Sequence, residues 1–289
     1  MPEPGELGEA KTSRPIRLVR LVNRLMADPG VSITLQELGA ATGAAKSTLS
    51  EDVATIDRAL EAEGRGYVER TLGPAGGVRY LPFPAPDNTE AALDELAAEL
   101  SRPERRLQGG FLYLTDIVFS PQWVSRLGEI FASLFAAGQP DMVLTVETKG
   151  IPLALMTARA LGIPLAVARR EAGMTEGPAL GLNYLSGTAR RMGTMTLARR
   201  AVPEGSRVLI IDDFLKGGGT ARGLVDMMAE FNAEVTGIGV LISTKDPEEK
   251  LVDDFVALLE LSADTGSGGA AFQLTRQLKL APRRSGGRA

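Results

Sequence analysis

The chain has 289 residues, of which 44% are hydrophobic, and its 32 basic and 36 acidic residues give a formal charge of −4. This length leaves room for two domains, each with a core of its own. The chain contains neither cysteine nor histidine, which excludes disulfide scaffolds, thiolate zinc sites, iron–sulfur centres, cysteine nucleophiles and imidazole catalysis. The acidic opening is unlike a signal peptide, and no apolar run is long enough to span a membrane. We therefore expect a cytoplasmic protein with no membrane partner.

The first part of the chain predicts three helices after a disordered start at 1–12. Apolar residues recur at helical spacing, and Thr34 and Glu37 have the spacing of a capping box. The three helices are expected from residue 13 to the stop at 28–30, from the capping box to a break at Gly43, and over 45–63. A short helix, a glycine-containing turn and a longer helix together predict a helix-turn-helix.

Two β-like pieces, 67–72 and 78–81, follow the third helix and are joined by a glycine-rich turn. A hairpin in this position is typical of the wing of a winged helix, so we expect such a domain over 13–81. Residues 12–50 carry five basic and two acidic side chains, a local charge of +3 in an otherwise acidic chain. A basic segment of this kind favours a separate module with a partner of its own. The positions of the polar residues in the third helix favour double-stranded DNA as that partner.

Short polar and basic side chains gather at the start of the third helix, where a recognition helix contacts the major groove. The predicted DNA-binding residues are Lys46, Ser47, Thr48 and Ser50 of this helix, with Arg65 and Arg79 around the hairpin. The hydroxyl groups suit base edges, whereas the long cationic side chains suit phosphates. Because serine and threonine also cap helices for local reasons, a plain three-helix bundle is the alternative interpretation.

A proline-rich stretch predicts a linker at 82–88, and after it helices and strands alternate. We expect helices near 89–100, 122–137, 153–161 and 221–232, and strands at 111–119, 142–147, 164–168, 180–186, 192–198, 207–212, 235–243 and 255–261. This alternation predicts a mainly parallel sheet with helices on both faces, over 89–275. The low-complexity segment 264–271 and the basic tail 276–289 are expected to be mobile.

The string VLIIDDFLKGGGT carries the strongest chemical signal. It places two carboxylates at the end of a buried strand and a glycine-rich turn before a helix, where ligands of open α/β sheets bind. Backbone N–H groups of such a turn can bind a phosphate, and the carboxylates can accept hydrogen bonds from ribose hydroxyls. The predicted ribose 5-phosphate site comprises Asp212, Asp213, Phe214, Leu215, Lys216, Gly217, Gly218, Gly219 and Thr220.

This string resembles the type I phosphoribosyltransferases, which bind phosphoribosyl pyrophosphate (PRPP). The resemblance implies that Thr148, Lys149 and Gly150 form a pyrophosphate loop, that 169–195 corresponds to a mobile loop and hairpin, and that Mg²⁺ accompanies PRPP. Two departures from the enzymes stand out: Lys216 and Gly217 replace a small residue and a threonine, and Phe214 is bulkier than the usual residue. We therefore predict a non-catalytic site, with no catalytic residues and no metal site in the protein itself.

Together with the winged helix, the chain resembles the purine operon repressor family of Gram-positive bacteria. The strings that carry the resemblance are GPAGGVRYLP, ETKGIPLA, TEGPALGLNYLSG, MGTMTLARR and DDFLKGGGT. The resemblance implies an α/β fold, with a winged helix-turn-helix domain followed by a type I phosphoribosyltransferase-like sheet. It also implies a homodimer that represses purine biosynthesis genes, PRPP that weakens operator binding, and a guanosine tetra- or pentaphosphate alarmone (ppGpp-like) that competes for the same pocket.

An active purine phosphoribosyltransferase with an appended winged helix is the alternative. An enzyme must stabilise departing pyrophosphate, and four arginines of the segment 169–195 could do so: Arg169, Arg170, Arg190 and Arg191. A nucleotide kinase is excluded because the chain has no GxxxxGK[ST] phosphate loop.

Overall fold

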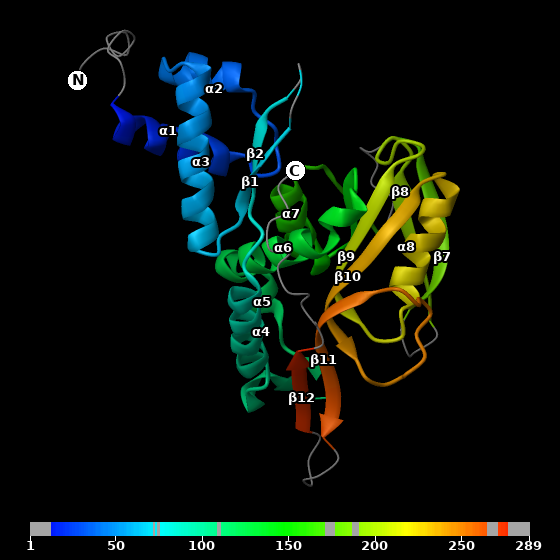
Figure 1. The fold of residues 1–289 in the computed structure, drawn as a ribbon. Helices are drawn as coiled ribbons and strands as arrows, with labels where there is room; N and C mark the ends of the chain where they lie inside the picture. Colours follow the sequence, from blue (N-terminus) through cyan, green and yellow to red (C-terminus); the bar gives the residue numbers. More distant parts are fainter. Residues whose placement is uncertain are drawn as a thin grey trace, which may run out of the picture. The chain divides into compact units, whose positions relative to one another are not determined.

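The computed structural model describes residues 13–71, 73, 76–108, 111–170, 177–186, 191–264 and 271–276, and Figure 1 draws its ribbon. The chain divides into two compact units, Met1–Ala85 with Arg159–Gly162, and Pro86–Ala158 with Ile163–Ala289. The predicted disordered start, 1–12, lies outside the described residues, as do 265–270 of the predicted mobile segment 264–271 and 277–289 of the predicted mobile tail 276–289. Asp264, Ala271 and Arg276, at the ends of these segments, lie in strands. None of the described helices is long and apolar enough to cross a membrane.

The N-terminal unit contains the predicted three helices and hairpin. They are α1 (Arg14–Ala27), α2 (Leu35–Thr42), α3 (Lys46–Ala62), β1 (Tyr67–Arg70) and β2 (Val78–Leu81). The capping box forms as expected: the Thr34 hydroxyl accepts a hydrogen bond from the Glu37 N–H at 3.1 Å, and the Glu37 carboxylate accepts from the Thr34 N–H at 2.8 Å. Gly43 ends α2 in the left-handed conformation at φ 69°, which glycine adopts without a Cβ clash.

The core of this unit joins the helices to the hairpin. Leucines of α1 and α2 pack with the apolar face of α3 and with the inward residues of the strands; the buried set is Leu21, Leu25, Ile33, Leu38, Leu49, Val53, Ile56, Val68, Val78 and Tyr80. Ile33, just before α2, also pairs with Val78 of β2. The hairpin is therefore part of the fold of the domain and holds a fixed position beside α3.

The C-terminal unit is built on a six-stranded sheet in the order β12-β11-β10-β9-β5-β6, and Figure 1 shows β9 and β10 side by side within it. The strands are β5 (Met142–Val146), β6 (Leu165–Ala168), β9 (Arg207–Leu215), β10 (Glu234–Thr244), β11 (Val256–Asp264) and β12 (Ala271–Arg276). All neighbouring pairs are parallel except β11 with β12. The predicted mainly parallel sheet is confirmed.

Helices cover both faces of this sheet. The remaining elements are α4 (Pro86–Leu100), η1 (Pro103–Arg105), β3 (Arg106–Leu107), β4 (Phe111–Leu112), α5 (Thr115–Val118), α6 (Pro121–Phe135), η2 (Ala136–Gly138), α7 (Gly150–Leu161), β7 (Ala179–Ser186), β8 (Arg191–Ala198) and α8 (Gly219–Glu230). Phe135 of α6 lies where a Cβ on Gly237 or Gly239 of β10 would stand. On α8, Leu224 and Met227 belong to the core cluster that also contains strand residues and the antiparallel β7–β8 hairpin.

Three sequence predictions for this unit need correction. The strand expected at 111–119 is wrong beyond Leu112, because Leu114, just before α5, and Ile117 and Val118 within it are buried at helical spacing. Helix α4 begins at Pro86, inside the predicted linker 82–88, since proline is well suited to the first turn of a helix. Strand β12 was not predicted at all; it pairs antiparallel with β11 over Ala271–Arg276.

Candidate functional site

The start of α3 presents the polar side chains that the sequence singled out. Lys46 and Ser47 are exposed, whereas Thr48 and Ser50 are half-buried. The residue before the helix is Ala45, which has no side chain to cap the first N–H groups. This end of α3 therefore combines exposed side chains with the positive end of the helix dipole, an arrangement that suits the phosphates and base edges of DNA.

An arginine that was not predicted as a site residue connects the β1–β2 hairpin to α3 through hydrogen bonds. Arg70, the last residue of β1, donates from Nη1 to the Ser50 hydroxyl at 3.3 Å and from Nη2 to the Ser50 carbonyl at 3.2 Å. The Ser50 hydroxyl thus has a protein partner, which weakens its predicted role at base edges. Arg70 lies 20 positions from Ser50, so no local pattern pointed to the pair.

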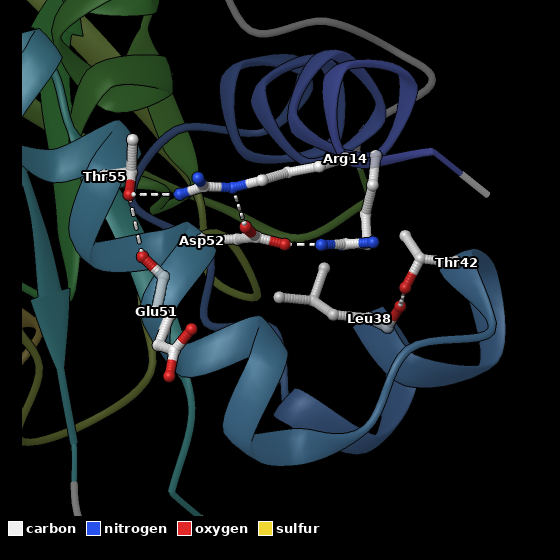
Figure 2. Close-up of polar contacts among 7 residues, drawn as sticks. Arg14, Leu38, Thr42, Glu51, Asp52 and Thr55 are labelled. Atoms are coloured by element: carbon white, nitrogen blue, oxygen red, sulfur yellow. Dashed lines mark hydrogen bonds and ion pairs between the residues drawn. The ribbon is translucent and has the colours of Figure 1, made fainter. Parts of the chain in front are cut away.

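Two of the basic residues of α1 bind a buried carboxylate of α3. Asp52 is 1% exposed; its Oδ1 lies 3.2 Å from Arg14 Nε, and its Oδ2 lies 2.5 Å from Arg17 Nε. Figure 2 shows the Asp52 carboxylate between two guanidinium groups and shows Thr55, which accepts a bond from Arg14 Nη2 at 3.2 Å and donates to the Glu51 carbonyl at 3.0 Å. Part of the positive charge of residues 12–50 therefore fixes α1 to α3.

The two predicted phosphate contacts around the hairpin differ in their surroundings. Arg79 lies opposite Glu69 in the β1–β2 ladder, and its Nε is 2.6 Å from Glu69 Oε2. Arg65 is exposed, and its carbonyl accepts a hydrogen bond from the Tyr80 hydroxyl at 2.6 Å. Arg79 must therefore share its charge between Glu69 and any phosphate, and Arg65 keeps its predicted position at the surface.

In the C-terminal unit, the predicted ribose-phosphate loop runs from the end of β9 into α8. Strand β9 continues to Leu215, three residues beyond its predicted end. Gly218 has φ 78° and is the residue before α8, which begins at Gly219. The loop borders a hollow of about 190 Å³ lined by Asp212, Phe214, Leu215, Lys216, Gly217, Gly218, Gly219, Thr220, Ala221 and Val240.

The two carboxylates of this site have different environments. Asp212 is 8% exposed and its Oδ1 accepts a hydrogen bond from the Asp213 N–H at 2.9 Å, whereas Asp213 is half-buried. Burial, followed by the charge of Asp213, raises the pKa of the Asp212 carboxyl well above its ordinary value. Asp213 is therefore the more exposed carboxylate of the pair, whereas Asp212 is the one that lines the hollow.

A residue that the sequence analysis missed lies beside Asp212. Thr145 is fully buried in β5, and its hydroxyl has no hydrogen-bond partner among the residues that the structure describes. A Cβ on Gly150 would stand 2.5 Å from this hydroxyl and 2.7 Å from Asp212 Oδ1. Only glycine fits at position 150, which brings the predicted pyrophosphate loop directly against the predicted ribose site.

The remaining residues of the predicted pyrophosphate loop lie at the surface. Thr148 is exposed and Lys149 is half-buried, both in the turn between β5 and α7. Glu147, just before them, accepts a hydrogen bond from the Arg170 N–H at 2.6 Å. The charge of Arg170 lowers the pKa of Asp212, although burial has the larger opposite effect. Of the four arginines considered for pyrophosphate, Arg190 and the side chain of Arg191 lie outside the described residues.

Within the described part of the chain, no three acidic side chains cluster closely enough to hold a metal ion. The groups available at this site are carboxylates, backbone N–H groups and nearby cations. That set suits a sugar phosphate, because the carboxylates accept from hydroxyls while the glycine turn and helix start receive the phosphate.

Two family models match the chain: the N-terminal domain of bacterial purine repressors over residues 13–82 and the phosphoribosyl transferase domain over residues 115–274. The purine biosynthesis transcriptional repressor PurR of Bacillus subtilis is 44% identical over 252 residues, which cover 87% of this chain and 88% of that protein. The purine biosynthesis transcriptional activator PurR of Lactococcus lactis subsp. lactis is 38% identical over 246 residues, 85% of this chain and 90% of that protein.

Among solved structures, adenine phosphoribosyltransferase from Thermoanaerobacter pseudethanolicus matches with a TM-score of 0.50 and 22% identity, over 58% of this chain and 99% of that one. At this identity the likeness concerns the fold alone. The predicted fold class, a winged helix followed by a type I phosphoribosyltransferase-like domain, is confirmed.

Proposed function

The chain belongs to the family of bacterial purine biosynthesis regulators, and from this premise we propose that it represses purine genes at operator DNA and that PRPP weakens this binding. The observation that carries the proposal is the presence, in one chain, of an exposed recognition-helix start and a ribose-phosphate loop. The loop offers the carboxylates of Asp212 and Asp213 to ribose hydroxyls and the turn at Gly217 and Gly218 to the 5-phosphate. A ligand at this loop can change DNA affinity only through coupling between two sites.

The DNA-binding side of the proposal rests on α3 and the wing. Ser47 and Thr48 would meet base edges, whereas Lys46 and Arg65, both exposed, would contact phosphates. A single winged helix makes few contacts, and a two-fold dimer would double them on a palindromic site. We therefore include a homodimer in the proposal.

The effector side is proposed to bind without turnover. Lys216 and Gly217 stand where the enzymes have a small residue and a threonine, and both border the hollow. Lys216 is exposed, so its charge is available to a phosphate or diphosphate. Mg²⁺ carried by the diphosphate of PRPP would keep ligand and water oxygens in its coordination shell, as this ion commonly does.

A guanosine tetra- or pentaphosphate is proposed as the competing ligand. Its support is the resemblance to the purine operon repressor family together with the chemistry of the loop, which suits phosphorylated ribose in general. An alarmone bound in place of PRPP would not release the operator, so it would favour repression.

The experiment that tests the proposal measures binding of the full chain to DNA from upstream of the source organism's purine genes, with and without PRPP. A parallel assay follows pyrophosphate release with adenine, guanine, hypoxanthine and xanthine. We expect PRPP to weaken DNA binding and no base to support turnover. Turnover of about 1 per second or more would instead support the enzyme alternative.

The sign of regulation needs its own measurement, because one relative is named a repressor and another an activator. A reporter gene behind the same upstream DNA should be expressed more strongly when the chain is deleted. Lower expression after deletion would identify an activator and would contradict the proposed sign.

A further inference from the structure

The segment that joins β10 to β11 holds the outer side of the ribose-phosphate loop. Lys250 of this segment donates from Nζ to the Lys216 carbonyl at 2.6 Å, and the Leu251 N–H donates to the Gly217 carbonyl at 3.0 Å. A Cβ on Gly218 would stand 3.1 Å from the Leu251 nitrogen. Two successive carbonyls of the loop are thus bound by one short segment.

The ammonium of Lys250 is surrounded by oxygen atoms. Besides the Lys216 carbonyl, it donates to the Thr244 carbonyl at 2.8 Å, to the Thr244 hydroxyl at 3.4 Å and to the Pro247 carbonyl. The Thr244 hydroxyl donates in turn to the Asp246 carbonyl at 2.7 Å and also lies 3.4 Å from the Lys216 carbonyl. A single cation therefore connects the end of β10, the following turn and the ligand-binding loop.

We propose that Lys250 is a positioning residue that fixes the loop 216–218 so that its backbone N–H groups stay directed at the bound phosphate. The C=O and N–H of a trans peptide point in opposite directions. Holding the carbonyls of Lys216 and Gly217 on the outer side therefore turns the N–H groups of Gly217 and Gly218 inward. A charged donor on a carbonyl also polarises the N–H of the same peptide and strengthens it as a donor.

Partial burial lowers the pKa of Lys250, while the charges of Asp246 and Glu260 oppose this effect. Three of the hydrogen bonds that Lys250 donates go to carbonyl oxygens, those of Lys216, Thr244 and Pro247. This role cannot be taken over by an apolar side chain of the same length, which makes Lys250→Met a direct test. Lys245, an exposed lysine at the start of the same segment, gives the matched control Lys245→Met.

The first measurement uses the ligand-free full chain and follows hydrogen exchange of the Leu251 amide, whose acceptor is the Gly217 carbonyl. In Lys250→Met this amide should exchange about tenfold faster or more, after correction for the changed neighbouring side chain, since a charged hydrogen bond contributes at least one decade. Lys245→Met should leave the rate unchanged. Thr244→Val, which removes a smaller part of the same contacts, should accelerate exchange in the same direction. An unchanged Leu251 rate in both Lys250→Met and Thr244→Val would overturn the proposal.

The second measurement titrates the same proteins with PRPP, and this step rests on the proposed function. We expect about tenfold weaker binding by Lys250→Met and unaltered binding by Lys245→Met. If exchange accelerates but the wild-type chain does not bind PRPP, Lys250 keeps its assigned role in the loop and the proposed ligand is wrong. If wild-type binds PRPP and Lys250→Met binds it equally well, the assignment of Lys250 is wrong.

Discussion

The two functional regions are held together by different forces. At the DNA-binding region, side-chain charges determine the geometry: Asp52 binds Arg14 and Arg17, and Glu69 binds Arg79. Beside the ribose-phosphate loop, close packing also determines it: the backbone of Gly150 lies against the Thr145 hydroxyl and the Asp212 carboxylate.

This difference has a consequence for function. Ion pairs at a surface can exchange partners, so Arg79 of the wing can transfer from the Glu69 carboxylate to a phosphate at modest cost, whereas Arg17 is held by the buried Asp52. At Gly150 there is no room for a side chain, so this part of the effector site cannot adjust in the same way and instead selects a ligand by shape. We therefore expect DNA affinity to depend on side-chain charge and on salt, and PRPP affinity to depend on side-chain volume at the effector site.

The largest expected effect comes from Asp52→Ala, which removes the buried partner of two arginines. Arg17 has a side chain that is 13% exposed and Asp52 one that is 2% exposed, so this half of the cluster is a buried pair. Its loss should destabilise the N-terminal unit by about 3 kcal/mol, whereas the exposed Arg14 half adds little. Chemical denaturation followed by circular dichroism measures the loss.

The control for this variant is Glu51→Ala, which removes the same charge from an exposed position of the same helix. The only tryptophan of the chain, Trp123, lies in α6 of the C-terminal unit, so its fluorescence follows that unit separately. Asp52→Ala should leave the tryptophan transition and PRPP binding unchanged. Equal loss of stability in both variants would show that charge removal, rather than the buried pair, is responsible.

Gly150→Ala should affect the stability of the C-terminal unit and its binding of PRPP. Its Cβ would stand 2.5 Å from the Thr145 hydroxyl and 2.7 Å from Asp212 Oδ1, so one of these groups must move. We expect a loss of about 2 kcal/mol in the stability of the C-terminal unit and severe loss of PRPP binding, with operator affinity unchanged without PRPP. Gly181→Ala is the control, because the nearest atom to its Cβ lies 3.8 Å away. Normal PRPP titration of Gly150→Ala would contradict the packing interpretation.

Asp212→Asn should change how stability depends on pH. The folded-state pKa of Asp212 is raised well above its ordinary value, so between the two values the folded chain holds a proton that the unfolded chain has lost. The stability of the wild-type protein should therefore fall as pH rises through this window, then level off above the folded pKa. Asp212→Asn should lose this component and bind PRPP more weakly, since Asn has one acceptor oxygen fewer.

Thermal unfolding across pH measures this difference, with Asp226→Asn as the control. Asp226 forms an ion pair with Arg222 at 2.9 Å on the exposed side of α8. Parallel pH profiles of Asp212→Asn and the wild-type protein would show that Asp212 ionises normally in the folded state.

The smallest expected effects concern the wing. If Arg79 contacts a phosphate, Arg79→Ala should reduce the slope of log affinity against log salt by up to about 0.9. Glu69→Gln should tighten DNA binding, most clearly at low salt, because it removes the carboxylate 2.6 Å from Arg79 Nε. Thr48→Ala removes no charge and should leave the slope unchanged while it weakens sequence discrimination. A slope unaffected by Arg79→Ala would place this arginine outside the DNA contact.

Much of the fold followed from local patterns in the sequence. The capping box of Thr34 and Glu37 and the left-handed stop at Gly43 depend on residues a few positions apart, and both formed as expected. The string around Asp212 and Asp213 likewise determined that a strand leads through a glycine turn into a helix, because the order of these residue types is itself the motif. The local pattern gave a wrong prediction at 111–119. The burial of Leu114, Ile117 and Val118 there favours a helix over a strand.

Only the tertiary structure decided which polar groups are partners. Arg14 and Asp52 are separated by 38 positions, Arg70 and Ser50 by 20, and Lys250 and Lys216 by 34. No periodicity or motif encodes such pairs, because a hydrogen bond requires two atoms within about 3 Å and that distance exists only after the core has brought the segments together. The sequence thus determined the two modules and the composition of their sites. The folded chain determined which charges are neutralised within it and which remain available to DNA and to a ligand.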